Sequence, residues 1–219
     1  MCVGFWSLEH PKYALIMCSN RDEFLTRPTT PAHWHSFDNE NDGGSGSGAV
    51  LSGRDLLAGG TWAGITRIGR VALLTNITEP HGRYSSSRGD LTSSFLLAAT
   101  PPATLHEEID RTLAQDKRYA GFNLLLLCPA RPIDHGDGRA LSLDAAFLTN
   151  SGGGGKIKAR PLDQEERRCG ALSNGIDHHG AAEWPKVRRG SQMFQDILNC
   201  LGDDAPDSDL TERLFDLLT

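Results

Sequence analysis

Apolar residues in the first third of the chain gather in short runs, and turn-forming residues separate one run from the next. This pattern is typical of the strands of an antiparallel sheet. The predicted strands are Cys2–Leu8, Tyr13–Cys18, Ala49–Ser52, Thr61–Thr66 and Val71–Thr75. In the last of these, and again in Phe122–Leu127, most consecutive positions are apolar, which predicts strands covered on both faces.

Between and after these strands, apolar residues recur at helical spacing, which predicts four amphipathic helices. Their apolar residues are Leu91, Phe95 and Leu96; Leu105, Ile109 and Leu113; Met193, Phe194, Ile197, Leu198 and Leu201; and Leu210, Leu214 and Leu217. A weaker pair of strands, 141–143 and 145–148, and a further run, Cys169–Ser173, lie between the second and third helices. This order lacks regular βαβ alternation and therefore predicts an α+β fold.

Two segments are so rich in glycine and polar residues that they carry little folding information. Residues 38–48 and 150–155 are predicted to form flexible surface loops. A chain of 219 residues is long enough for one large domain or two small ones. The first loop interrupts strands that must pair across it, and the second lies where a strand connection is expected, so we expect a single domain over residues 1–219.

The charge of the chain argues against a nucleic-acid partner. The chain carries 22 Lys and Arg against 28 Asp and Glu, a formal net charge of −6. Its basic residues are scattered among acidic ones, so a nucleic-acid partner is not expected. No apolar run approaches the ~18 residues that span a bilayer, and no basic segment followed by an apolar one marks the start. We therefore expect a soluble protein with no transmembrane segment and no standard secretion signal.

The five cysteines are widely spaced, odd in number and without a C-x-x-C pair. This arrangement suits neither a disulfide framework nor a zinc ribbon and is typical of reduced, intracellular thiols. Two histidine pairs, His33 with His35 and His178 with His179, lack the spacing and the partners of a zinc site. No metal is expected.

The first candidate for chemistry is Cys2, which follows the initiator methionine. Methionine is normally removed before a small residue, which would leave Cys2 with a free α-amine beside its own thiol. An amine with a pKa of about 7.7–8.0 can act as a base near neutral pH, and a thiol is readily activated as a nucleophile. The alternative is that cysteine occupies the second position by chance, because reactivity needs a pocket that a dipeptide does not reveal.

Two further segments have the composition of a binding or catalytic site. Ser19–Phe24 packs three ionisable residues and an amide at the end of a predicted strand, where neighbouring charges can orient one another. A solvated turn would have the same composition. Gly59–Gly64 places Trp62, a large apolar surface, between glycines that permit close backbone approach.

Together these segments carry a resemblance to a known family. The matching stretches are Met1–Cys2, Asn20–Phe24 with Arg27–Pro28, Leu51–Asp55, Gly59–Gly64, Arg70–Asn76, Ser87–Leu91, Gly121–Leu124 and Leu172–Asn174. Their order and spacing resemble the NRDE family, to which the transport and Golgi organisation protein 2 homologues of animals belong. The match runs from residue 1 to about residue 200.

The resemblance implies a fold like that of the N-terminal-nucleophile hydrolases, a four-layer αββα sandwich of two antiparallel sheets. Known members continue beyond the last helix into further strands, so a C-terminally shortened form of this fold is expected. The family is similar to cysteine-dependent enzymes that cleave linear amides. The site residues implied by that similarity are Cys2 as the nucleophile, Asn20, Arg21, Asp22 and Glu23 as the orienting cluster, and Asn76 and Asn174 as oxyanion or amine-positioning residues.

An asparagine donor fixed at a strand end can meet a developing oxyanion, which supports this assignment, although a turn cap would explain Asn76 and Asn174 equally well. The family resemblance also implies a different function, a binding or carrier protein for haem or an acyl compound in lipid or secretory-pathway homeostasis. In that interpretation Trp6 and Trp62 would form the walls of a ligand pocket. No cofactor is required, and haem enters only as a bound ligand. The resemblance places the protein in the cytoplasm, with mitochondrial or Golgi association. The amidohydrolase is the alternative to the carrier.

Overall fold

The chain divides into two compact units, each of which has its own sheet and helices. A computed structural model describes residues 2–37, 48–80, 82–97, 104–130, 141–202 and 205–219. The first unit comprises residues 1–22 and 162–219, and the second comprises residues 23–161. The expectation of a single domain over residues 1–219 stays a prediction.

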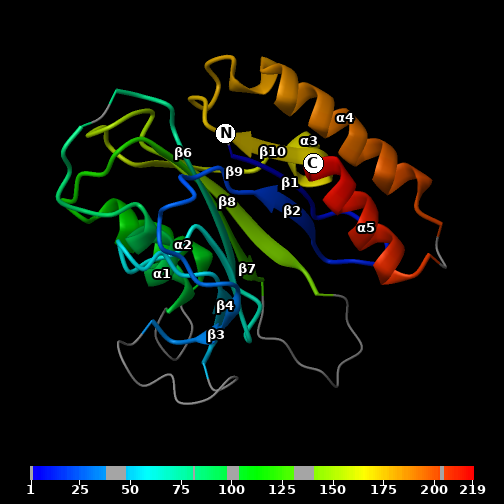
Figure 1. The fold of residues 1–219 in the computed structure, drawn as a ribbon, viewed down its shortest axis with the longest axis horizontal. Coiled ribbons are helices and arrows are strands. Elements are labelled where there is room, and N and C mark those ends of the chain that lie inside the picture. Colours follow the sequence, from blue (N-terminus) through cyan, green and yellow to red (C-terminus); the bar gives the residue numbers. More distant parts are fainter. Residues whose placement is uncertain (1, 38–47, 81, 98–103, 131–140, 203–204) are drawn as a thin grey trace. The chain divides into compact units, whose positions relative to one another are not determined.

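The first unit is built on a three-stranded antiparallel sheet whose order is β10-β1-β2. Its strands are β1 (Val3–Ser7), β2 (Ile16–Asn20) and β10 (Gly170–Ser173). Its helices are α3 (Gln164–Cys169), α4 (Pro185–Cys200) and α5 (Asp207–Leu218), with a 3-10 turn at Ala181–Glu183. Figure 1 shows α4 and α5 running side by side, and both pack on the sheet. The central strand β1 is therefore buried along its whole length.

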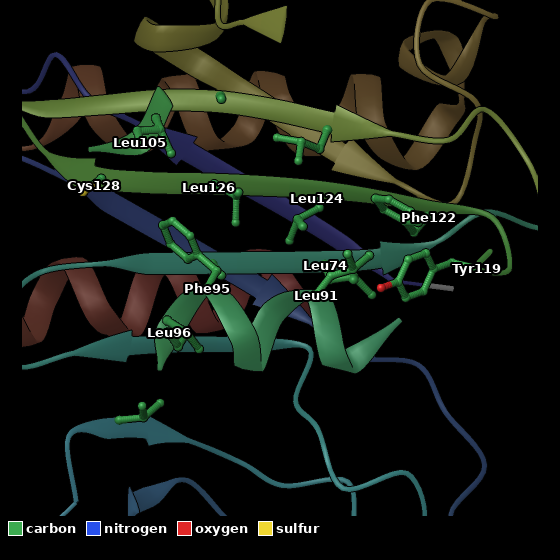
Figure 2. Close-up of a cluster of buried hydrophobic side chains, with 14 residues drawn as sticks. Leu74, Leu91, Phe95, Leu96, Leu105, Tyr119, Phe122, Leu124, Leu126 and Cys128 are labelled. Carbon is green, nitrogen blue, oxygen red and sulfur yellow. The ribbon is translucent and has the colours of Figure 1, made fainter. Parts of the chain in front are cut away.

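The second unit is a seven-stranded antiparallel sheet in the order β3-β4-β5-β6-β7-β8-β9. Its strands are β3 (His33–His35), β4 (Val50–Ser52), β5 (Ala63–Thr66), β6 (Val71–Asn76), β7 (Phe122–Pro129), β8 (Leu143–Thr149) and β9 (Lys158–Pro161). Two helices, α1 (Gly89–Leu96) and α2 (Leu105–Leu113), accompany it. Figure 2 shows Phe95 and Leu96 of α1 in one apolar cluster with Leu124 and Leu126 of β7.

A buried ion pair joins α2 to the sheet of the second unit. The side chains of Arg70, which precedes β6, and Glu108 of α2 are 1% and 7% exposed, and their nitrogen and oxygen atoms lie 3.1 Å apart. Arg70 also donates to the carbonyl oxygen of Phe95, and Arg111 donates to the second oxygen of Glu108. Because a buried charge is costly unless it is paired and hydrogen-bonded, this network fixes both helices on the sheet.

The mixture of helices and antiparallel sheets confirms the α+β class. The prediction that Val71–Thr75 and Phe122–Leu127 are covered on both faces is also confirmed, because every residue in both runs is buried. The predicted strand pair at 141–148 is wrong. A single strand, β8, begins at Leu143 and pairs with β7 on one side and β9 on the other. The charged residue Asp144 gave the impression of a turn, but it is an exposed position within this strand.

The glycine-rich segment 150–155, predicted to be a flexible loop, has specific hydrogen bonds in the structure. The side chain of Asn150 donates to the carbonyl oxygens of Tyr119 and Ala120 and accepts from the N–H of Phe122. The carboxylate of Glu79 accepts from the backbone N–H of Gly153. These polar residues therefore pair with backbone rather than with solvent. Residues 38–47 of the other predicted loop lie outside the described residues.

Within the described ranges, no helix combines the length and the apolar character needed to cross a membrane.

Candidate functional site

The thiol of Cys2 lies beside the backbone of Asp22. Antiparallel pairing places Val3 of β1 opposite Asn20 of β2, so the start of β1 meets the end of β2. The N–H of Asp22 donates to Sγ of Cys2 over 3.3 Å, and Sγ lies 3.8 Å from the carbonyl oxygen of Asp22. The thiol is half-buried and is held by backbone atoms whose positions the sheet fixes.

The side chain of Asn20 fixes the backbone that carries the thiol. Its Oδ1 accepts from the N–H of Val3 over 2.9 Å. A side-chain acceptor at this position satisfies a backbone donor at the beginning of the strand. Asn20 therefore positions Cys2 through the following peptide group.

The carbonyl oxygen of Cys2 receives two donors from the other edge of the sheet. Oγ of Ser173, the last residue of β10, donates to it over 2.7 Å. Nζ of Lys186 donates to it over 2.8 Å, and the same nitrogen lies 3.3 Å from Oδ1 of Asn174. Asn174 follows β10 directly and is buried. Residues from β2, β10 and α4 thus converge on Cys2.

The sequence analysis missed Lys186. It lies in the first turn of α4, after a proline at the first helical position, where a lysine looks like an ordinary solvated residue. In the structure Lys186 is half-buried. Burial lowers the pKa of the Lys186 ammonium, and the charge of the Cys2 thiolate partly offsets this by raising it. No sequence pattern connects Lys186 to Cys2, because their contact is tertiary.

The structure brings together only some of the predicted site residues. Cys2, Asn20, Arg21, Asp22 and Asn174 all belong to the first unit.

Glu23, Asn76 and Trp62 belong to the second unit. Glu23 lies 3.9 Å from Arg27. Asn76 ends β6 opposite Phe122. Trp62 precedes β5 and packs so closely on Gly53 that a Cβ there would lie 2.9 Å from the indole ring.

Trp6, predicted to be the other wall of a ligand pocket, is a fully buried residue of β1. Its indole ring packs against Gly170, where an added Cβ would come within 2.1 Å of Cε2. The side chain occupies the space that a larger residue at position 170 would need. Its role in ligand binding stays a prediction.

Over the described part of the chain, no group of three or more His, Cys, Asp or Glu residues could hold a metal ion. The arrangement around Cys2 instead offers a thiol, backbone and side-chain donors and one cation.

Comparison with solved structures tests the expected fold. The Caenorhabditis elegans N-acylethanolamine-hydrolyzing acid amidase ortholog has the same fold, with a TM-score of 0.61 over 97% of this chain and 85% of that one at 11% sequence identity. The expected fold of the N-terminal-nucleophile hydrolases is thereby confirmed. The chain belongs to the Transport and Golgi organisation 2 family, whose profile matches residues 1–219. The resemblance to the NRDE family, which is the same family, is confirmed.

The curated relatives include animal proteins of that name. The Transport and Golgi organization protein 2 homolog of Bos taurus is 34% identical over 135 residues, which cover 57% of this chain and 44% of the relative. The Transport and Golgi organization 2 homolog of Mus musculus is 27% identical over 234 residues, covering 100% of this chain and 71% of the relative. The matched part is thus less than half the length of the bovine relative.

Proposed function

We propose that this protein is a cysteine amidase or acyl transferase of the N-terminal-nucleophile type, acting on linear N-acyl amides after removal of Met1. The observation that carries the proposal is the placement of the Cys2 thiol, which the N–H of Asp22 holds at 3.3 Å. Two donors on the Cys2 carbonyl, from Ser173 and Lys186, fix the rest of the residue. The name of the fold neighbour, which hydrolyses N-acylethanolamines, supports an amide substrate for this chain.

The chemistry begins with a proton transfer within Cys2. Its α-amine accepts the thiol proton, and the sulfur attacks the carbonyl carbon of the amide. The C–N bond then breaks, the leaving amine takes the proton, and a thioester remains on Sγ. Water attacks the thioester, which releases the carboxylic acid and restores the thiol. If an alcohol or amine attacks instead, the acyl group is transferred to it.

Asn174 is suited to stabilise the negative oxygen that forms in both steps. Because Nζ of Lys186 lies beside its Oδ1, the amide is oriented with Nδ2 on its other side. A fixed amide donor that meets an oxyanion typically accelerates the reaction by about 10²–10³-fold. The role of Asn76 stays a prediction.

The test is acylation of the purified chain, followed by intact mass. Burial raises the pKa of Cys18 to about 12 and also raises the pKa of Cys128 and Cys169, so these thiols should react slowly. Cys200 is exposed and is replaced by Ser in every variant. With a panel of N-acylethanolamines and activated acyl esters, we expect a mass that lacks Met1 and a single acyl adduct. Cys2→Ala should remove the adduct, whereas Cys169→Ala should retain it.

The carrier interpretation is the second candidate, and the reference to transport in the family's name is what favours it. It assigns no reaction to Cys2. Binding of haem or of a fatty acyl compound that survives Cys2→Ala, together with a retained Met1 and no adduct, would overturn the amidase proposal and support a carrier.

A further inference from the structure

The charge of Lys186 lies close to the group that would act as the base. Nζ of Lys186 is 2.8 Å from the carbonyl oxygen of Cys2. Within one residue the backbone nitrogen and the carbonyl oxygen are at most about 3.6 Å apart, because three short bonds connect them. The ammonium of Lys186 is therefore within about 6.5 Å of the nitrogen that becomes the α-amine of Cys2.

We propose that the ammonium of Lys186 keeps the α-amine of Cys2 unprotonated near neutral pH, so that the amine can accept the thiol proton. This inference rests on the proposed function of Cys2. It assigns Lys186 as a positioning and electrostatic residue, which acts through Cys2 and makes no bond to the substrate.

The physical need for such a residue follows from the ordinary properties of an α-amine. Its usual pKa is about 7.7–8.0, so at pH 7 most of the amine is protonated and cannot act as a base. A like charge within about 6 Å disfavours the protonated form. The ordinary pKa of lysine, 10.5, lies well above the range in which an α-amine titrates; burial lowers the pKa of Lys186 and the Cys2 thiolate opposes that lowering. The two amines titrate as a coupled pair.

Several contacts hold the ammonium of Lys186 beside Cys2. Lys186 is anchored by Oδ1 of Asn174 as well as by the carbonyl oxygen of Cys2. Its nitrogen also lies 5.7 Å from the centre of the Trp184 ring, a contact that favours the charged form. Contacts from Cys2 before β1, Asn174 after β10 and Trp184 before α4 thus hold the ammonium in one place.

Other ionisable groups raise or lower the pKa of the Cys2 α-amine according to the sign of their charge. Asp22, whose backbone touches the thiol, carries a negative charge that favours the protonated amine, and Arg21 before it carries a positive one. Asp177 follows the end of β10, and Glu183 precedes α4. The thiolate of Cys2 itself is a further negative charge beside the amine. The variant Asp22→Asn removes one of the opposing charges and measures its contribution.

The experiment titrates the α-amine directly. The chain is labelled with ¹⁵N-cysteine and produced with Cys2 as its first residue by cleavage of a removable tag, and the amine nitrogen, which resonates away from the backbone amides, is followed against pH. Lys186→Gln removes the charge and keeps a donor, and it should raise the pKa of the amine by about one unit. Lys186→Arg should leave it near the wild-type value.

Ser173→Ala is the matched control, because Ser173 donates to the same carbonyl oxygen without a charge. If Lys186 acts only by holding the backbone, Ser173→Ala and Lys186→Gln will change the pKa of the amine equally, and the proposal fails. It also fails if neither variant shifts it. Because like-charge repulsion is screened by salt, raising the ionic strength should raise the amine pKa in the wild type and leave it in Lys186→Gln. If Lys186→Gln does not fold, Lys186→Met removes the same charge and is titrated in its place.

The amine titration needs no turnover, so its outcome is separate from that of the proposed function. If Lys186→Gln raises the amine pKa but the chain forms no acyl adduct, the electrostatic role of Lys186 is supported and the amidase is overturned. An acyl adduct in a chain whose amine pKa does not change in Lys186→Gln would support the amidase and overturn the electrostatic role of Lys186. In the active chain, Lys186→Gln should also move the acidic limb of the rate profile upward by the same one unit or so.

Discussion

Asp55 shows how one carboxylate can organise a turn. Its Oδ2 accepts from Nη2 and Nε of Arg27 at 2.6 and 2.9 Å, and its Oδ1 accepts from the N–H groups of Leu57 and Ala58. Burial alone would raise the pKa of Asp55, but the hydrogen bonds from Arg27 and from these amides outweigh it, so the pKa lies below its ordinary value. The charged form is therefore stabilised by folding.

The sign of the pH dependence follows from this lowered pKa. A carboxylate whose pKa is lower in the folded state adds stability above its unfolded pKa of about 3.9, and this is lost as the pH falls through the folded value. Asp55→Asn should cost about 1–3 kcal/mol at pH 7, and the gap to wild type should shrink below about pH 4. Urea unfolding at pH 7 and pH 3 measures it. Asp110→Asn, at an exposed pair with His106, should change stability by under about 1 kcal/mol at either pH.

At the level of single residues, the sequence identified side chains better than their tasks. Asn20 and Asn174 were named as site residues, and both contact Cys2 or its anchors. The oxygen of Asn20 serves a backbone N–H, which a residue type alone does not reveal. Lys186 could not have been found, because it is 184 residues from Cys2 and belongs to a basic stretch that any surface helix might carry.

Among the elements, α4 combines a structural and a functional task. Its Phe194 stacks on Phe5 of β1, with ring centres 5.9 Å apart, and its first turn carries Lys186. Gly190 lies between them, and a Cβ at this position would come within 2.2 Å of Cζ of Phe5. The distance between α4 and β1 is thus set by the absence of a side chain at Gly190.

Gly190→Ala should therefore push α4 away from β1. Alanine is a better helix former than glycine by about 1 kcal/mol, but overpacking costs typically 1–3 kcal/mol, and we expect a net loss of stability of about 1–2 kcal/mol. Because the same helix carries Lys186, acylation of Cys2 should slow as well. Gly202→Ala, at a glycine with open space around its Cβ position, is the control that should change neither. Thermal unfolding and acylation kinetics together test this. Unchanged acylation in Gly190→Ala would show that the position of α4 does not matter for the site.

Helices and strands were predictable where apolar residues formed a continuous run or recurred at regular spacing. They were not predictable where polar contacts define the element. The runs at 71–75 and 122–127 were found because their burial leaves a continuous apolar pattern. The helix α3, with the sequence QEERRC, has no apolar face and begins at a capping box between Asp163 and Glu166. The strand β9 is charged and half-exposed, and it is a strand because β8 offers it an edge.

At the scale of the whole molecule, the first unit is discontinuous in sequence. Its strands β1 and β2 come from the start of the chain, whereas β10, α4 and α5 come from its last third. Leu210 of α5 is buried in the same apolar cluster as Ile16 and Cys18 of β2. The core of this unit thus needs both ends of the chain.

A chain that stops at residue 206 should therefore lose its first unit selectively. Without α5, we expect faster hydrogen exchange of the amides in β2 and α4, against which α5 packs, and slower acylation of Cys2, because β2 and α4 also carry its contacts. The amides of β6 and β7, which have their own core, should keep their protection. Mass spectrometry of exchanged peptides reports both. Glu212→Ala, on the exposed side of α5, should leave the pattern unchanged, and equal loss of protection in both units would contradict the division.

The pairing of Val3 with Ser173 also sets an order of events during synthesis. The ribosome adds roughly 5–20 residues per second, so about ten to thirty seconds separate the appearance of Cys2 from that of its partner strand. During this interval β1 can pair with β2, but Ser173 and Lys186, which contact the carbonyl oxygen of Cys2, have not yet been made. The proposed release of the α-amine of Cys2 can thus take place on the nascent chain, before its partners from β10 and α4 exist.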